Sequence, residues 1–269
     1  MQAVTADGRV AWTAAIAPGI NKIPDFQGGL VLQDDFTVTK LDGLTGQPHP
    51  TYTIPDPINT KIGSTVVHTD GTIFVVAGDS VIGLDPSAGG QKFSVQMEHS
   101  KQTSNGAALP DSPPQTGKRI VAGDGNAYVA YEYSVGANFS SGGPPWFLTS
   151  HTDSYLKVLR VGTDGSSTET LVKSWSVDFA RQLLDGPQRG PGNGNVESVA
   201  PAGSGVRRSA ATLASASALL NSNSLDGLIT NADQGVLFSF LDPSVQGVPP
   251  TQTVATVSTG GGVQLSTMR

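Results

Sequence analysis

Short apolar runs separated by polar breaks recur along the first two thirds of the chain. Residues 71 to 77 (GTIFVVA) and 80 to 84 (SVIGL) are two such runs, followed by a Leu-Asp pair and a Gly-rich turn. Val, Ile, Thr, Phe and Tyr dominate these runs, as in β-strands, and the runs are too short to be typical helices. The pattern therefore predicts an all-β protein made of short strands.

The same order of features returns at a fixed spacing. Residues 28 to 55 contain a glycine, an apolar run, an acidic break, a second run, a Leu-Asp pair, a Gly-rich turn and an aromatic residue. The Leu-Asp pairs at 41–42 and 84–85 are 43 residues apart, and so are Gly46 and Gly89. Two matches at one offset predict a repeat of about 43 residues, a length typical of propeller blades.

Further copies of the unit are less regular. Residues 6 to 12 resemble the second half of a unit, and a third full copy begins at Gly125 and resumes after an insertion. Its turn would lie at 161–165 and its aromatic residue would be Trp175. Residues 227 to 243 begin a last partial copy. Because one four-stranded unit cannot cover its own apolar faces, the units are expected to stack as blades of a β-propeller, partial or open.

The repeat predicts that the chain is divided into three segments. We expect propeller blades over 1–180, a partial one first and then three fuller ones. A linker rich in Gly, Pro, Ser and Ala is expected over 181–224, and a final partial blade over 225–269. Two stretches within the first segment, 102–118 and 136–152, have the composition of long exposed loops, and the second of them interrupts the third blade.

The linker itself is not uniform. Residues 185 to 205 are rich in Gly and Pro and are expected to be its flexible part. Residues 209 to 220 (SAATLASASALL) favour one helix, with a strand or coil as the alternatives because of the serines.

Composition excludes several classes of function. The chain of 269 residues has no cysteine, which excludes disulfides, thiolate metal sites and a cysteine nucleophile. A net charge of −6 provides no basic surface for nucleic acid. No apolar run reaches the roughly 20 residues of a membrane-spanning helix. The first twelve residues, MQAVTADGRVAW, lack the regions of a signal peptide and read as the middle of a hairpin, so we expect a fragment of a larger protein.

The unit resembles the PQQ-type propeller repeat, in which two strands precede an LD pair, a TG turn and a tryptophan. The matching residues are LDGLTG at 41–46 and LDPSAG at 84–89, and residues 68–76 (HTDGTIFVV) resemble the opening strand of such a blade. The resemblance covers residues 1 to 180, and 225 to 258 less fully. It implies a relation to quinone-dependent dehydrogenases, outer-membrane assembly factors or bacterial surface proteins, and hence a periplasmic or cell-surface location.

Two departures bear on the cofactor that this family implies. The dehydrogenases usually carry a vicinal cysteine pair over the quinone, and this chain has none. Tyr52 and Phe93 stand where the family has tryptophan in the two best units. We therefore expect no cofactor, and PQQ with calcium is the alternative.

Few residues have the pattern of a catalytic site. Asp42 and Asp85 immediately precede turns, where an aspartate caps the backbone with its own carboxylate. Asp34 and Asp35 are neighbours and would point to opposite faces of a strand, which disfavours an acid/base pair.

The remaining candidates are also better explained by structure than by catalysis. The four histidines are far apart in sequence and lack metal-ligand spacing. Residues 78–80 (GDS) match a lipase block only superficially and predict a turn. No catalytic, cofactor-binding or metal-binding residue is predicted.

Trp146 and Phe147 follow two prolines in the expected loop over 136–152. Exposed aromatic residues there would contact a ligand or a protein or glycan partner, or would pin the loop to the blade. The sequence thus favours a non-catalytic scaffold or binding module of an exported or surface protein of a bacterium. The alternative is an enzyme, either a degenerate quinoprotein dehydrogenase or a propeller hydrolase with acids around its channel.

Overall fold

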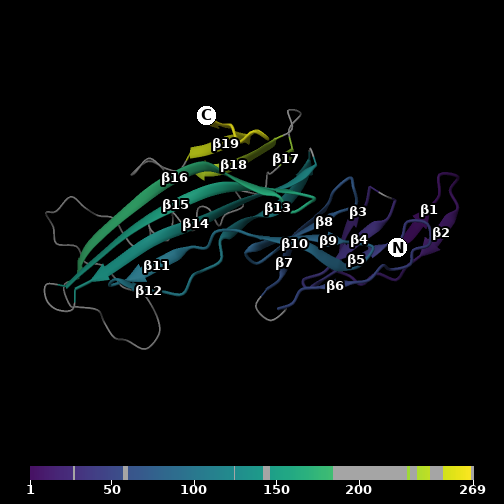
Figure 1. The fold of residues 1–269 in the computed structure, drawn as a ribbon, viewed down its shortest axis with the longest axis horizontal. Helices are drawn as coiled ribbons and strands as arrows, with labels where there is room; N and C mark the ends of the chain where they lie inside the picture. The colour runs from purple at the N-terminus through teal and green to yellow at the C-terminus, as the bar shows by residue number, and fades with distance from the viewer. Residues whose placement is uncertain are drawn as a thin grey trace.

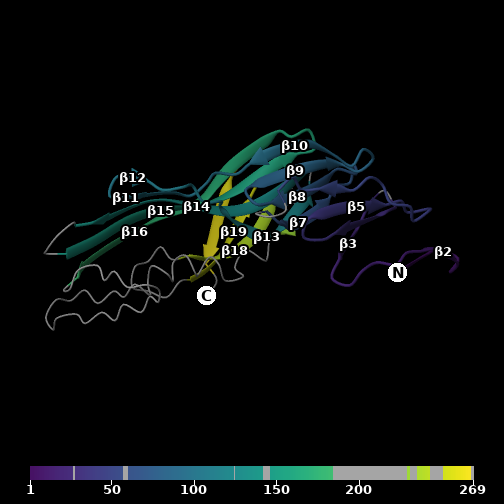
Figure 2. The ribbon, with the colours of Figure 1, turned by 90° about the horizontal axis from the view of Figure 1, so that it is seen from below.

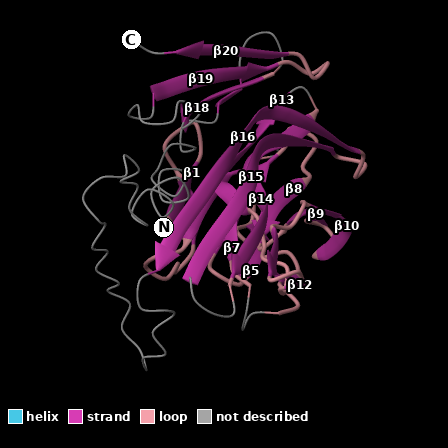
Figure 3. Ribbon diagram, turned by 90° about the vertical axis from the view of Figure 1, so that its left-hand side faces the viewer, coloured by secondary structure: helices cyan, strands magenta, loops and turns pink. Residues whose placement is uncertain are grey.

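A computed structural model describes most of the chain. The described residues are 1–26, 28–56, 60–123, 125–141, 146–183, 229–230, 235–242 and 251–267. Within them the regular structure consists of strands, as predicted (Figure 3). The expected flexible stretch over 185–205 and the expected helix over 209–220 lie outside the described residues.

The strands form an N-terminal hairpin and four larger sheets, and neighbouring strands are antiparallel except for one pair. The hairpin consists of β1 (Gln2–Val4) and β2 (Val10–Thr13). The next sheet consists of β3 (Asn21–Pro24), β4 (Leu30–Gln33), β5 (Thr37–Leu41) and β6 (Tyr52–Thr53). The one after it consists of β7 (Ile62–Val67), β8 (Ile73–Ala77), β9 (Ser80–Asp85) and β10 (Gly90–Gln96).

The two C-terminal sheets differ in length. The longer contains β11 (Lys101–Ser104), β12 (Ala107–Ala108), β13 (Gln115–Gly123), β14 (Asn126–Ser140), β15 (Trp146–Gly162) and β16 (Ser167–Leu183). The last contains β17 (Ile229–Thr230), β18 (Val236–Asp242), β19 (Thr251–Val257) and β20 (Val263–Thr267). Figures 1 and 2 show the sheets following one another along the molecule, with the N-terminal hairpin far from the last sheet. The described sheets therefore form an open row.

Both faces of the inner sheets are buried, because alternate residues of one strand enter two different cores. In β8, Ile73 and Val75 pack against the sheet of β3–β6, whereas Phe74 and Val76 pack against the sheet of β14. Successive side chains of a strand point to opposite faces, so a continuous apolar run supplies both cores. This is the physical reason why the strands of the repeat read as unbroken apolar runs.

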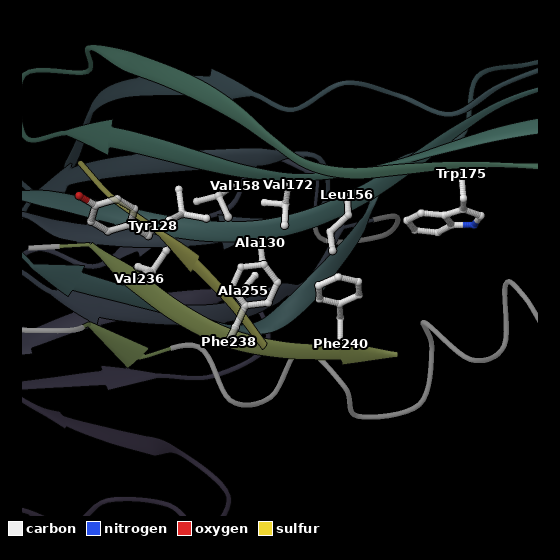
Figure 4. Packing of buried hydrophobic residues seen from close by; sticks show 11 residues of the cluster. Tyr128, Ala130, Leu156, Val158, Val172, Trp175, Val236, Phe238, Phe240 and Ala255 are labelled. Carbon is white, nitrogen blue, oxygen red and sulfur yellow. The ribbon is translucent and has the colours of Figure 1, made fainter. Parts of the chain in front are cut away.

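A third core joins the long sheet to the last one (Figure 4). Tyr128 and Ala130 of β14 and Leu156 of β15 face Phe238 and Phe240 of β18. Both phenylalanines are fully buried, and their ring centroids are 6.2 Å apart. Since Ala127 and Val129 of β14 enter the preceding core instead, β14 is shared by two cores in the same way as β8.

A turn glycine of each sheet receives a side chain from the preceding sheet. Gly46, Gly89 and Gly165 have φ values of +70°, +62° and +85°, which glycine adopts without strain. A Cβ atom added to Gly46 would lie 2.6 Å from the Trp12 indole, whose Nε1 donates a hydrogen bond to the Gly43 carbonyl (2.8 Å).

The same contact recurs in the following sheets. An added Cβ would lie 2.5 Å from Pro50 at Gly89 and 3.0 Å from Phe93 at Gly165. In the last sheet, a Cβ atom added to Gly261 (φ +81°) would lie 3.5 Å from the Thr170 hydroxyl oxygen. Trp175, the aromatic residue expected for the third unit, lies instead in the core beside the last sheet.

Replacing Gly46 by alanine is expected to destabilise the protein by about 1–3 kcal/mol, because a left-handed backbone and a close aromatic contact both disfavour a Cβ atom. The measurement is urea unfolding. Gly8 provides the control, since its φ is +83° and an added Cβ would meet nothing within 4 Å. Gly8→Ala should therefore lose only the stability that alanine costs in a left-handed backbone. An equal loss of stability in both variants would show that the Trp12 contact is unimportant.

Of the two long loops expected in the first segment, the one over 136–152 is wrong, whereas the one over 102–118 is wrong at its two ends and in the short strand β12, and its residues 105–106 and 109–114 lie outside the strands. Residues 136–140 and 146–152 continue β14 and β15 and are paired in register, as at Asn138 with Ser150. Of the other stretch, residues 102–104 belong to β11, which runs parallel to the end of β14, and residues 115–118 begin β13. Backbone hydrogen bonding to neighbouring strands holds these polar segments as strands, although their Gly, Ser and Pro content is typical of loops.

Candidate functional site

The long hairpin of β14 and β15 extends beyond the stacked cores as an arm, which we define as residues 135–141 and 146–153. In register, Val135 lies opposite Asp153 and Phe139 opposite Thr149, and the Ser141 N–H donates to the Phe147 carbonyl (3.0 Å). Val135, Phe139 and Phe147 therefore share one face of the arm.

This face of the arm is apolar and open to solvent. The exposed fractions are 40% for Val135, 57% for Phe139 and 42% for Phe147. The two phenylalanines are diagonal neighbours on adjacent strands, a separation of about 7–8 Å between backbone positions. The backbone of Trp146 opens β15 opposite Leu183, whereas its side chain lies outside the described part. Phe147, predicted as a contact residue, is thus exposed and has Phe139 beside it, which the sequence analysis did not single out.

Charged groups lie beside the arm's apolar face. His151 Nδ1 is 2.7 Å from Asp178 and His151 Nε2 is 3.3 Å from Asp153. Hydrogen bonds that the imidazole donates to the carboxylates of Asp178 and Asp153 raise the pKa of His151. All three side chains are exposed or half-buried, so the group is a polar rim around the apolar residues and not a buried reactive centre.

The predicted turn aspartates have the structural role expected of them. The Asp42 carboxylate accepts hydrogen bonds from the backbone N–H of Leu44 (3.0 Å) and Thr45 (2.8 Å). Asp85 accepts from the N–H and hydroxyl of Ser87 (2.9 and 2.6 Å). These bonds lower the pKa of both carboxyls and cap the turns that connect strands of the repeat.

Residues 78–80 form a turn in which the order of side chains differs from that of a catalytic triad. The Asp79 carboxylate lies between Ser80, whose hydroxyl donates to it (2.8 Å), and His99 Nε2 (2.5 Å). A triad needs histidine between the nucleophile and the acid, so that the imidazole can take the nucleophile's proton. This cluster therefore closes a turn.

A second polar group of the long sheet is satisfied internally. Lys157 Nζ lies 2.9 Å from Glu169 and 3.0 Å from Glu98, and 5.1 Å from the centroid of the Tyr133 ring. Burial lowers the pKa of Lys157, but the two carboxylates outweigh burial and raise it above its usual range. Tyr133 also stacks on Tyr155, with 5.0 Å between centroids. The network stabilises this face of the sheet, and its lysine and two glutamates are paired with one another.

The opposite face of the long sheet holds a cavity of about 200 Å³. The Glu132 side chain of β14 lines this cavity together with side chains from the neighbouring strands. Trp175 and Val177 form the apolar side of the cavity. Glu132 is only 9% exposed, and among the described residues no hydrogen bond or ion pair to its carboxyl is present. Burial raises the pKa of Glu132 to about 8.

The ionisation of Glu132 is expected to make the protein less stable as the pH rises. The folded pKa of about 8 lies above the ordinary value of 4.5, so between these pH values the native state holds a proton that the unfolded chain releases. Stability then falls with rising pH, by at most about 1.4 kcal/mol per pH unit. From pH 6 to pH 7.5, the wild type should lose about 2 kcal/mol relative to Glu132→Gln, whose side chain does not titrate.

Urea unfolding of both proteins across this range measures the difference. The comparison cancels the titration of His151 and other groups that the two proteins share. Parallel stability curves for the wild type and Glu132→Gln would contradict a buried, protonated carboxyl.

Within the described ranges, no three His, Asp or Glu side chains are grouped in a way that could hold a metal ion. None of the described residues forms a helix that is long and apolar enough to cross a membrane.

Each of the four larger sheets contains four consecutive antiparallel strands, β13–β16 in the long sheet. Units of this kind, stacked face to face and repeated with similar glycine turns, define the class of β-propeller-type repeat proteins. A family model described as outer membrane protein assembly factor BamB matches residues 1–146, more than half of the chain. The chain belongs to this family of PQQ-type repeat proteins, as the LD and TG turns predicted. No curated protein matches the chain.

Two solved structures show weak likeness. A protein of unknown function from Bacteroides caccae has 13% identity and a TM-score of 0.38 over 90% of this chain, and the chain spans 57% of that protein. The WD40 domain of SCAP from fission yeast has 8% identity and a TM-score of 0.19, with 90% of this chain and 73% of that chain covered. At these TM-scores neither likeness bears on the fold or the function.

Proposed function

We propose that this chain is a non-catalytic binding module, and that its partner is another protein with an apolar surface. The observation that carries the proposal is the exposed apolar face of the arm, formed by Val135, Phe139 and Phe147. Aromatic residues in an apolar centre surrounded by a polar rim are typical of protein interfaces. Here the rim is supplied by His151 and Asp178.

The family supports the same interpretation. Its model is described as an assembly factor for outer membrane proteins, a role that depends on binding other proteins. We extend this to an exported or cell-surface location in a bacterium, where the stacked sheets would hold the arm away from the cores. The sheets serve as the scaffold, and the arm serves as the contact.

Site-specific photo-crosslinking tests this function. A photoreactive phenylalanine analogue is placed at Phe147 in the producing cell, and the crosslinked protein is identified, purified and titrated by calorimetry. The double variant Phe139→Ser/Phe147→Ser should bind it at least about tenfold more weakly, because both aromatic anchors are removed.

Leu171 of β16 provides the matched control, since it is 50% exposed and lies outside the arm. Leu171→Ser should bind the partner like the wild type. The proposal fails if no protein is crosslinked from position 147, or if the purified partner binds the double variant with unchanged affinity. A carbohydrate crosslinked in place of a protein would replace the protein partner by a glycan.

The proposed module includes no cofactor. PQQ with calcium is the alternative for an enzyme. The vicinal cysteines typical of the dehydrogenases are missing from this sequence, which disfavours that alternative. Titration with PQQ and calcium, followed by tryptophan fluorescence, decides the matter: saturable micromolar binding would favour the enzyme.

A further inference from the structure

The cavity beside Glu132 lies on the face of the long sheet that is opposite to the arm's apolar face. Glu132 is paired with Leu156, and Ser134 with Ser154, which places their side chains on the same side as Tyr128 and Ala130. Trp175 belongs both to the core drawn in Figure 4 and to the lining of the cavity, so the cavity adjoins this core, and most of its other lining side chains are polar.

The polar lining of the cavity is neutral apart from Glu132. Hydroxyl and amide groups come from neighbouring strands, namely Ser134, Thr152, Ser154, Gln102 and Gln115. Hydroxyl and amide groups both donate and accept hydrogen bonds. The nearby charges on this face, Lys173 and Asp242, are paired with each other at 3.2 Å. Complementarity therefore favours an uncharged ligand that carries several hydroxyl groups.

Glu132 is the feature that a packed core does not explain. The residue is 9% exposed and its side chain lines the cavity, and no described side chain forms a hydrogen bond with its carboxyl. A carboxyl removed from bulk water is costly unless it is hydrogen-bonded. In its protonated form, the carboxyl can donate through its O–H and accept through its other oxygen. A hydroxyl group of a ligand would satisfy both.

From this geometry we propose that the cavity binds one small neutral polyol, of the size of a monosaccharide. The Glu132 carboxyl and the Thr152 hydroxyl would bind its hydroxyl groups, and Trp175 would contact an apolar C–H face. This site lies on the opposite face of the sheet from Val135, Phe139 and Phe147, and it does not depend on the protein binding proposed for those residues.

The size of the cavity agrees with such a ligand. An engineered cavity of about 150 Å³ accepts benzene, so about 200 Å³ accommodates one six-membered ring with some substituents. Drug-sized molecules need about 300 Å³ or more. Gly136 leaves space beside the cavity because it has no Cβ atom. An added Cβ would lie 3.0 Å from both the Gln102 amide oxygen and the Thr152 hydroxyl oxygen.

Saturation-transfer NMR with the purified chain tests the proposal. The probes are methyl glucoside, methyl galactoside, methyl mannoside and N-acetylglucosamine, and methylammonium serves as the cationic comparison. We expect at least one sugar to bind and methylammonium not to bind. Thr152→Val and Glu132→Leu should each weaken sugar binding by about tenfold, the value of one lost hydrogen bond to a buried group.

Thr149→Val is the matched control, because Thr149 lies on the other face of the same strand. It should bind sugar like the wild type, and Glu132→Gln, which keeps a donor and an acceptor, should remain within a few-fold of it. Circular dichroism verifies that each variant is folded. The proposal is overturned if none of the four sugars binds the folded wild type, if methylammonium alone binds, or if Thr152→Val and Thr149→Val bind sugar equally.

Discussion

Replacing Lys40 by methionine is expected to destabilise the protein by about 3–5 kcal/mol. Lys40 Nζ lies 2.5 Å from the Asp25 carboxylate, and the exposed fractions of the two side chains are 10% and 1%. The substitution removes the lysine cation that lies beside a buried carboxylate, and the uncompensated desolvation of that charge causes the loss. Urea unfolding measures it.

The exposed ion pair of Lys61 and Asp35 provides the control. Its separation is 2.6 Å, but its side chains are 67% and 60% exposed. Lys61→Met should therefore cost less than about 1 kcal/mol. The double variant Asp25→Leu/Lys40→Met should recover much of the loss, because it removes both buried charges. Equal losses for Lys40→Met and Lys61→Met would contradict the role given to burial.

Replacing Phe238 by alanine is expected to cost about 3–5 kcal/mol, because a large cavity would open in a fully buried core. Phe238 lies between the long sheet and the last sheet (Figure 4). Since each sheet contacts mainly its neighbours, amide hydrogen exchange should accelerate more in β18 and β19 than in β8 and β9. The total loss is measured by urea unfolding.

The neighbouring residue provides a control for this variant. Leu237 belongs to the same strand, points to the other face and is half-buried. Leu237→Ala should cost no more than about half as much as Phe238→Ala, since fewer contacts are lost. If Leu237→Ala costs as much as Phe238→Ala, or if exchange accelerates equally in all sheets, the assignment of this core is incorrect.

The repeat could be found from the sequence because the turns place strict demands on it. A backbone with positive φ needs glycine, and a tight turn favours an aspartate that caps it, so Asp42 with Gly46 and Asp85 with Gly89 recur visibly. The side chain that docks on each glycine is less constrained. Trp12, Pro50, Phe93 and Thr170 all occupy this place, so a search for a tryptophan finds only the first.

The arm and the cavity could not be found in the same way. Residues 136–141 contain the Gly and Ser typical of a loop, whereas pairing with β11 and β15 keeps them extended. Glu132 looks like an exposed acid in YVAYEYS. The one signal of its burial was its position in the strand. Glu132 lies two residues after Ala130 and four after Tyr128, on the same face of the strand as these two buried residues.

The burial of both faces of β8 and β14 also affects how such a chain can change in evolution. In a sheet with one wet face, a strand that slips by one residue moves apolar side chains into water, and this cost fixes the register. In β8 the same slip would merely exchange Ile73 and Val75 with Phe74 and Val76 between two equally dry cores. Insertions are then restrained mainly by the turns, and the tip of a hairpin can lengthen by pairs of residues while the stack beneath it stays intact.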